Sequence, residues 1–528
     1  MATVDFLADK ENGILHQTVQ VVQVPVYEQD INDDIVVDAA AGNVDSYLKL
    51  APDGRTVLVP QPSDDPNDPL NWSSTKKHAI LIVLSITAGL GDYSSAAGIP
   101  LIMSQGLEWN RTPAKVNETG NLNVLMVAIG GLFWIIVSTW WGRGPALFWS
   151  TLTGCAFTIA CAVTHNYSVY YGFRVLMGFS FCAFQIVGLA CIKDMFFFHE
   201  HARKIGIWAY GVFLTPYLAP MFSNFIIAGT HGRWRVAFWL VFAVGTFDLL
   251  LILLISDETY YDRSIPAHKQ PARPKTFVGR MARLTGVWQI QNHNAAGFYH
   301  LRHAVTRLVK TFLKPIMIPC MIYYAMTFMW VVGINITSAI LLQTPQEYGG
   351  YGFDNNAIGY LLFAPLVAVT IGELSGHFFN DLIAKRYVKK HNGVFKPEAR
   401  LLMNQVVVLL MVPGLVLVGQ TLEKHLSYAG IIMGWGMYVI GSMLASVSLT
   451  AYCLDSYGSA SSEVAGLLNF ARVGAGFSVG YFQEPWGKVN GYGQSFGIQA
   501  AIVAAASIIL TVLQIYGARM RAKSGPVV

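Results

Sequence analysis

The chain has 528 residues, 53% of them hydrophobic and only 13% charged, with a formal net charge of +5. Soluble globular proteins carry about 25% charged residues, so the composition excludes an ordinary soluble domain, and the modest net charge does not indicate a nucleic-acid partner. The six cysteines all lie in apolar segments and none has CxxC spacing, which predicts neither disulfides nor a metal site.

The first 75 residues form a separate region by composition. They contain 13 Asp or Glu residues against 3 Lys or Arg residues, and they lack a long apolar run. Such a segment cannot bury enough apolar surface to fold alone. Residues 1–75 are therefore predicted to be a disordered acidic cytoplasmic tail without a cleavable signal peptide.

Long apolar runs follow, and a run of ~18 or more apolar residues is typical of a membrane-spanning helix. We predict twelve such spans: 78–103, 119–141, 145–164, 168–192, 204–228, 234–256, 315–342, 357–380, 401–420, 428–454, 464–482 and 496–516. The expected fold is an all-α integral membrane protein with twelve transmembrane helices in two six-helix pseudo-repeats. The halves are 76–256 and 315–516, joined by the linker 257–314 and followed by a C-terminal tail, 517–528. Such paired halves bind substrate near the bilayer midplane and open alternately to each side.

The distribution of Lys and Arg predicts the orientation of these helices, because cytoplasmic loops are enriched in positive charge. With the N-terminus inside, the internal loops hold about 23 Lys or Arg residues and the external loops about 6. Both termini and the linker are therefore expected to be cytoplasmic, with the protein in the plasma membrane. The sequons at Asn110, Asn117 and Asn166 fall in predicted external loops and are candidate glycosylation sites.

Five short stretches carry a resemblance to a known family. They are DPNDPLNW before the first span, WWGRGPAL after the second, FRVLMG in the fourth, TPYLAPMFSN in the fifth and GHFFNDLIAKR in the eighth. In this order and on these spans they resemble motifs of the major facilitator superfamily, and within it of the fungal twelve-span drug:proton antiporters. The resemblance covers about residues 65–516.

The resemblance implies a secondary transporter and not an enzyme, with no cofactor, and the absence of a P-loop sequence argues against ATP-driven pumping. It favours proton-coupled efflux of small organic molecules, such as drugs or secondary metabolites, by a monomer in the lipid bilayer. Two alternatives stay open. One is uptake of a small organic cation such as a polyamine, which the stretch 376–402 and Asp92 favour; the other is a non-transporting sensor on the same fold.

The fifth span carries two prolines, Pro216 and Pro220, one turn apart. Each removes a backbone hydrogen bond and bends the helix, and the resemblance implies that this bend seals the closed carrier. The family's repeated glycines are absent here, so looser packing is expected. The alternative is a bent helix with no role in transport.

Charged residues after the second and eighth spans are candidate gating residues. Arg143 matches the family motif, but Thr139 stands where the family has an Asp, which predicts a weak cluster after the second span. The equivalent loop of the second half keeps its charged residues, which are Asp381, Lys385 and Arg386. The alternative for this loop is a solvated, positively charged surface.

Ionisable residues inside the bilayer are candidate sites because a buried charge is costly there. Asp92 lies near the midplane of the first span, where it could bind a proton or a cation, form a bond between helices, or lie outside a wrongly placed span. Glu373 and His377 are one turn apart and form either a proton relay or part of the gate. The resemblance gives Arg174 a role in proton coupling; the alternative is a buried partner for a carboxylate or backbone carbonyls.

Other polar residues within spans are candidate substrate contacts because they need partners. They are Gln185, Tyr210, Asn224 and Asn335. Arg472 in the eleventh span is expected to pair with Asp455 or Glu463.

Overall fold

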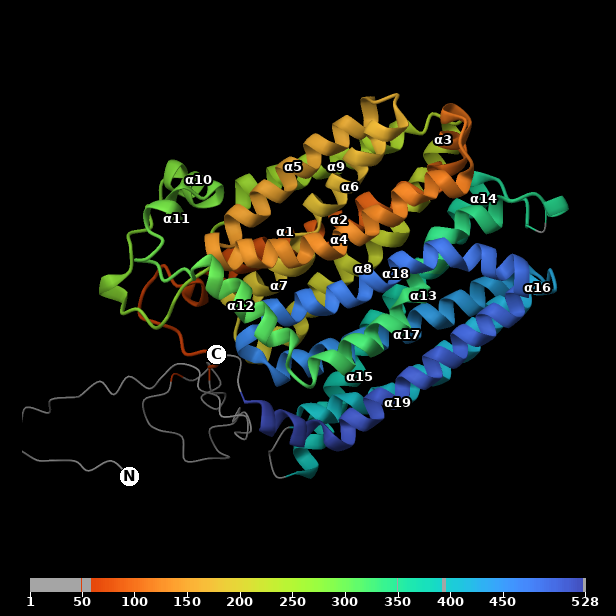
Figure 1. The fold of residues 1–528 in the computed structure, drawn as a ribbon. Helices are drawn as coiled ribbons and strands as arrows, with labels where there is room; N and C mark the ends of the chain where they lie inside the picture. Colours follow the sequence, from red (N-terminus) through yellow and green to blue (C-terminus); the bar gives the residue numbers. More distant parts are fainter. Residues whose placement is uncertain (1–48, 50–57, 349, 392–395, 526–528) are drawn as a thin grey trace, which may run out of the picture.

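The computed structural model describes residues 49, 58–348, 350–391 and 396–525, and no strand occurs among them. The helices run side by side in an elongated bundle (Figure 1). Three short helices, α10 (Phe277–Thr285), α11 (Val287–Gln291) and α12 (Leu301–Phe312), lie at one end, together with the C-terminal end of the chain. We call this the linker end, and the opposite end the far end.

The first set of helices contains the elements before the linker. They are α1 (Ser74–Thr87), α2 (Leu90–Ala96), α3 (Ile102–Trp109), α4 (Pro113–Trp141), α5 (Arg143–Val163), α6 (Tyr167–Phe181), α7 (Phe184–Met195), α8 (Phe198–Gly229) and α9 (Arg235–Ile255). Short interruptions divide two of the predicted spans of this set, so that α1, α2 and α3 together form the first span and α6 and α7 form the fourth.

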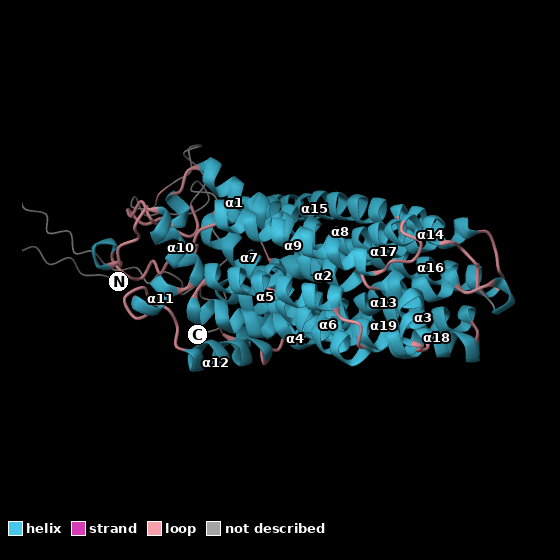
Figure 2. Cartoon of the chain, turned by 90° about the horizontal axis from the view of Figure 1, so that it is seen from above, coloured by secondary structure: helices cyan, strands magenta, loops and turns pink. Residues whose placement is uncertain are grey.

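The second set follows the linker. It comprises α13 (Met317–Gln343), α14 (Asn355–Leu361), α15 (Phe363–Lys390), α16 (Asn404–Glu423), α17 (Tyr428–Ser456), α18 (Ser461–Asn490) and α19 (Tyr492–Ser524). Short 3-10 helices occur along the whole described chain, before α1, within both sets and in the linker. They are Pro69–Asn71, Ile99–Leu101, Ala267–Lys269, Gln346–Tyr348, Pro397–Met403 and Gly458–Ala460. Figure 2 shows the same all-helical bundle from above, with loops gathered at its two ends.

In the described part of the chain, eleven helical segments are long and apolar enough to cross a membrane. They match eleven of the predicted spans to within a few residues at most ends. The predicted span 464–482 is the exception by composition, because α18 carries charged side chains along its length. It is nevertheless a 30-residue helix that packs between α4 and α13 (Figure 1).

The junction between α4 and α5 shows why a glycine stands there. Gly142 has φ +107°, a backbone conformation that side chains rarely adopt, and a Cβ at this position would lie 2.5 Å from Glu258 Oε2. The tight junction brings the first turn of α5 against a carboxylate that belongs to the start of the linker.

The tail prediction is wrong for its last part, while residues 1–48 and 50–57 lie outside the described residues. Asp68 is buried and accepts hydrogen bonds from Arg263 at 2.9 and 3.1 Å, and it also caps the 3-10 helix that follows. Burial acts to raise the pKa of Asp68, but the bonds and charge of Arg263 with backbone N–H groups hold that pKa below its usual range. Composition concealed this order because the stabilising arginine lies far along the chain, in the linker.

Candidate functional site

A cavity of about 1110 Å³ lies between the two sets of helices and opens at the linker end. Its rim includes His303, Asp381 and Lys385, and its walls come mainly from α7, α8, α15, α17 and α18. It extends inward to Phe213 on α8 and Arg472 on α18, which form its floor. The floor is thus built from one helix of each set.

An ion pair across the two sets closes this floor. Arg472 Nη2 lies 3.3 Å from Asp92 Oδ2 on α2 and donates to Asn469 Oδ1 at 2.9 Å. The guanidinium is also 5.1 Å from the ring centres of both Phe213 and Phe328, which is within cation–π distance. The pair therefore fixes a charge from each set in the centre of the bundle.

The prediction that Arg472 pairs with Asp455 or Glu463 is wrong. Asp455 instead pairs with Arg400 at 2.6 Å, and Glu463 pairs with Arg307 of the linker helix α12 at 2.8 Å. Sequence distance misled the expectation, since the carboxylate nearest to Arg472 comes from the first span.

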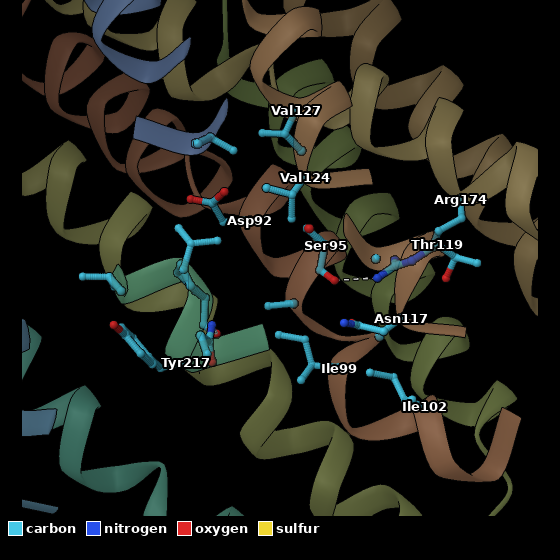
Figure 3. Close-up of a pocket in the computed structure, with 18 of the residues that line it drawn as sticks. Asp92, Ser95, Ile99, Ile102, Asn117, Thr119, Val124, Val127, Arg174 and Tyr217 are labelled. Atoms are coloured by element: carbon cyan, nitrogen blue, oxygen red, sulfur yellow. Dashed lines mark hydrogen bonds between the residues drawn. The ribbon is translucent and has the colours of Figure 1, made fainter. Parts of the chain in front are cut away.

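A second, smaller pocket of about 70 Å³ lies on the other side of the ion pair, toward the far end. Figure 3 shows Asp92, Asn117, Thr119 and Arg174 around it. Arg472 lines both spaces, whereas Asp92 lines only the smaller one. The ion pair therefore separates a cavity open to the linker end from a pocket at the far end.

Arg174 is buried on α6 and binds backbone, as one of the two expectations had it. Its guanidinium donates to the carbonyl of Ser94 at 2.6 Å and to that of Ser95 at 2.5 Å. Figure 3 shows the second of these bonds. These carbonyls end the short helix α2, two and three residues after Asp92. Arg174 therefore positions the helix that carries Asp92, and its role in proton coupling stays a prediction.

Gln185 faces the cavity from α7. Its side chain is only 3% exposed, and neither its amide oxygen nor its amide nitrogen has a hydrogen-bond partner among the described residues. Asn469 on α18 is 7% exposed, and its amide nitrogen is likewise unpartnered within the described chain. Buried amides without partners are costly, so both are suited to contact a bound molecule.

Glu373 and His377 lie together on α15, as their spacing predicts. His377 Nε2 is 3.3 Å from Glu373 Oε2, without the alignment of a hydrogen bond. His377 lines the cavity and packs on Gly206 of α8, whereas Glu373 is 2% exposed behind it. The histidine is thus the contact between the buried carboxylate and the cavity.

The two prolines of α8 free two carbonyl groups, and side chains satisfy both. Thr215 Oγ1 donates to Val212 O at 3.1 Å, which is the carbonyl that Pro216 leaves without an amide. Asn335 of α13 donates to Pro216 O at 2.8 Å, which is the carbonyl that Pro220 leaves. Asn335 therefore forms a structural hydrogen bond between the two sets, and it lines the smaller pocket.

The packing around these prolines is tight, against the expectation of looseness. A Cβ on Gly89 would lie 2.3 Å from the Thr215 side chain, and one on Gly211 would lie 2.0 Å from the carbonyl oxygen of Ser85. Two glycines outside the motif therefore allow this close approach. Gly211 lies one turn before Thr215 in α8, and Gly89 lies on the facing segment between α1 and α2.

The other two predicted contacts on α8 make bonds outside the cavity lining. The Tyr210 hydroxyl lies 3.1 Å from Thr370 Oγ1 of α15, which links the two sets. Asn224 is buried and donates to Pro220 O at 2.8 Å on its own helix. Neither side chain lines the two spaces described above, and substrate contact by either stays a prediction.

Arg143 belongs to a dense group of bonds at the linker end, which we call the Arg143 cluster (Arg143, Asp194, Glu258 and Gln289). Arg143 Nε donates to Asp194 at 3.4 Å. Glu258 accepts from the backbone amides of Arg143 and Gly144 at 3.1 and 3.0 Å and from Gln289 Nε2 at 2.8 Å. Burial raises the pKa of Glu258, and hydrogen bonds from the backbone amides of Tyr260 and Gly144 oppose the rise. The expectation of a weak cluster is wrong, because its carboxylates come from outside the motif.

The corresponding group of the second set, which we call the Asp381 group (Asp381, Lys385 and Arg386), is open. All three side chains are exposed near the end of α15, and none forms an ion pair among the described residues. Asp381 and Lys385 line the cavity rim. Their gating role stays a prediction.

The three sequons differ in accessibility. Asn110 and Asn166 are exposed at the far end, Asn110 after α3 and Asn166 as the N-cap of α6. Asn117 is 4% exposed and lines the smaller pocket. A glycan could not be attached to Asn117 in this conformation.

Sequence reasoning missed several residues of the site: Asp194, Glu258, Lys193, Phe213 and Asn469. Lys193 and Asp194 end a long apolar run, and such adjacent charges were a usable signal. Nothing in the local sequence marks Glu258. Within the described residues, no group of three or more His, Cys, Asp or Glu side chains could hold a metal ion.

The comparisons with known proteins agree with this architecture. The family model described as Major Facilitator Superfamily matches residues 81–481. The efflux pump radE of Floropilus chiversii is 25% identical over 464 residues, covering 87% of this chain and 83% of that protein. Polyamine transporter 3 of Saccharomyces cerevisiae is 25% identical over 479 residues, covering 88% and 72%. A partially occluded, inward-open structure of the xylose transporter XylE from E. coli superimposes with a TM-score of 0.55 at 15% identity, covering 83% and 99%.

Proposed function

The chain belongs to the Major Facilitator Superfamily, and from that premise we propose that it exports small organic molecules in exchange for protons. One observation carries the proposal: the cavity reaches from the linker end to the centre of the bundle and stops at the Asp92–Arg472 ion pair. A space open to one side only, ending between two sets of helices, is what an alternating-access carrier requires.

The ion pair supplies the barrier in this conformation. Asp92 belongs to the first set and Arg472 to the second, so opening the far end must separate them. Separating buried opposite charges without replacement partners is costly. A substrate or a proton that takes the place of one partner lowers that cost, which couples binding to the change of access.

Glu373 is the proposed proton carrier. It is buried 3.3 Å from His377, and His377 lines the cavity. A proton entering from the cavity can bind the histidine and pass to the carboxylate behind it. Proton loading and release at this carboxylate would change the local charge by one unit.

The direction of transport follows from orientation. The basic linker predicts that the linker end is cytoplasmic, so the cavity would face the cytoplasm and accept molecules for export through the plasma membrane. The curated relative named as an efflux pump supports this direction.

Uptake of an organic cation is the second candidate. The relative named as a polyamine transporter favours it, and Asp92 is a central carboxylate that could bind an ammonium group. In the conformation described, however, Asp92 lines only the far pocket. An imported cation would enter from that far side, and it would have to displace Arg472, which lies 3.3 Å from the carboxylate.

The test uses purified protein in liposomes with an imposed pH gradient, given labelled ethidium, spermidine or naphthalene-2-carboxylate in turn. We expect protein-dependent movement of at least one probe that stops when a protonophore dissipates the gradient. In Glu373→Gln, gradient-driven movement should fall at least about 10-fold while exchange of labelled for unlabelled probe persists.

Glu118→Gln is the matched control, since Glu118 forms an exposed pair with Lys115 at the far end. Probe movement that ignores the gradient would remove proton coupling. Full gradient dependence in Glu373→Gln would remove Glu373 as the carrier, and a protein that moves none of the probes would favour a sensor.

A further inference from the structure

Resting on the proposed function, we propose that the transported molecule is an organic acid whose carboxylate binds Arg472 at the floor of the cavity. The inference concerns the chemical class of the substrate, which the comparisons do not supply. It is carried by the hydrogen-bonding capacity that the floor leaves unused.

Arg472 has N–H groups that donate no hydrogen bond to the described residues. Both of its hydrogen bonds come from Nη2, to Asp92 and Asn469, while Nε and Nη1 bond to no described residue. A guanidinium offers five N–H donors in a fork that matches a carboxylate. Three of those donors therefore remain for a ligand, on a side chain that is only 5% exposed.

The surroundings of Arg472 favour an anion over bulk water. Phe213 and Phe328 lie on the guanidinium at 5.1 Å and exclude solvent from its faces. Asp92 contacts a single nitrogen at 3.3 Å and lies on the far side of the pair. A hydrogen bond between charged groups is strongest where water is excluded, so a carboxylate reaching the free edge of Arg472 would be bound well.

Two amides extend this binding surface. Gln185 and Asn469 both line the cavity, and both hold buried amide nitrogens without partners in the described chain. Whichever way the Gln185 amide is turned, it presents one donor and one acceptor. With Arg472, the floor has more free donors than free acceptors, which matches an acidic group and not an ammonium.

Three of the five carboxylates that line the cavity are already paired with arginine, and the other two, Asp262 and Asp381, lie at its linker end, away from the floor. Asp194, Asp455 and Glu463 each have an arginine partner, at 3.4, 2.6 and 2.8 Å. Lys193, in contrast, donates to the Ser461 hydroxyl at 2.6 Å and forms no ion pair with a carboxylate in the part of the chain that the structure describes. The inner cavity therefore carries unneutralised positive charge.

The rest of the ligand would be apolar. The walls next to the floor include Leu189, Trp208, Val212, Val447 and Leu468. Apolar walls with a few polar groups at one end are typical of sites for small amphipathic molecules. The expected substrate is thus a hydrophobic or aromatic body with one carboxylate.

The test measures binding of three probes with one ring system to the purified full-length protein at neutral pH without a gradient. The probes are naphthalene-2-carboxylate, naphthalene-2-carboxamide and naphthalen-2-ylmethylammonium. We expect the carboxylate to bind about 10- to 100-fold more tightly than the amide, because charge-assisted hydrogen bonds are replaced by neutral ones. The ammonium probe should bind most weakly.

Arg472→Gln should abolish the preference for the carboxylate. Lys488→Gln, which removes a positive charge from the exposed end of the same helix, should leave it unchanged. Gln185→Leu keeps Arg472 and should weaken carboxylate binding by about 5-fold while leaving amide binding within about 2-fold. This second variant decides the proposal if Arg472→Gln does not fold.

Equal affinity for the three probes, tighter binding of the ammonium, or an unchanged preference in both variants would overturn the proposal. The transport assay separates this failure from failure of the proposed function. Gradient-driven movement of ethidium or spermidine without carboxylate preference would overturn only the substrate class. Selective carboxylate binding without movement of any probe would overturn the transport proposal instead.

Discussion

The Arg143 cluster and the Asp381 group occupy corresponding places at the linker ends of the two sets of helices, but they are bonded very differently. In the first, Asp194 and Glu258 hold Arg143 and the first turn of α5. In the second, the three charged side chains that make up the group are exposed and unpaired within the described chain. The family motif is better preserved in the second loop, so motif completeness did not predict bonding.

This difference indicates that the linker ends of the two sets of helices need not rearrange to the same extent. The first set is tied to the linker by the amide bonds of Arg143 and Gly144 to Glu258 and by the pair of Lys76 with Asp257. The linker in turn is tied to the N-terminal segment by the pair of Arg263 with Asp68. The cavity rim, in contrast, is lined on α15 by free charged groups. We expect the linker end of the second set to rearrange more when access changes.

The largest expected effect comes from Glu258→Ala. The substitution leaves the backbone amides of Arg143, Gly144 and Tyr260 without their acceptor, while Gln289 keeps only its bond to the carbonyl of Arg283. Losing a buried charged acceptor costs about 3–5 kcal/mol. The shift in the thermal unfolding midpoint in detergent measures it, with Glu118→Ala as the surface control. A shift no larger than the control's would show that the Arg143 cluster contributes nothing to stability.

Arg283→Gln should be next, at about 2–3 kcal/mol, because Arg283 bonds Asp257 at 2.9 and 3.1 Å. Burial acts to raise the pKa of Asp257, but Arg283 and then Lys76 hold it below its ordinary value. The resulting stability is present above about pH 4 and is lost as pH falls through the lowered pKa.

Unfolding midpoints of wild type and Arg283→Gln should therefore differ by a constant amount between pH 7 and 5. The difference should begin to narrow below about pH 4 and should be smallest below the lowered pKa, where Asp257 is protonated in both folded proteins. A difference that grows on acidification would contradict the assigned pairing.

Asp455→Asn examines the second set and should cost about 1–2 kcal/mol. Asp455 accepts from Arg400 at 2.6 Å in a mostly buried pair, and asparagine keeps an acceptor but loses the charge. Its unfolding midpoint should lie between those of Glu258→Ala and the wild type. A loss as large as that of Glu258→Ala would show that the second set is tied as firmly as the first.

The smallest effect is expected from Asp381→Asn, at under about 0.5 kcal/mol, since the exposed carboxylate has no ion-pair partner in the described residues. If the Asp381 group closes the cavity in another conformation, transport should change although stability does not. Destabilisation beyond about 1 kcal/mol would mean that the group is already bonded.

The helical architecture could be predicted from the sequence because long apolar runs are a strong local signal. The span at α18 was found although its charges lower its hydropathy, and Asp92 was singled out because a charge in an apolar run is conspicuous. Bonding partners could not be predicted, because they join distant segments. Arg472 meets a residue 380 positions earlier, and Glu258 reaches back to the start of α5.

The hydrogen bond from Asn335 to the carbonyl of Pro216 gives α8 a dependence on its neighbour. A carbonyl group of α8 that its own helix cannot satisfy is hydrogen-bonded by the opposite set. If the two sets separate at this point, the carbonyl oxygen of Pro216 loses its donor. Water must reach that oxygen as the far end opens, because the cost of an unsatisfied buried carbonyl group would otherwise oppose opening. Wetting of the far pocket thus becomes a condition for opening, set by a proline and not by the substrate.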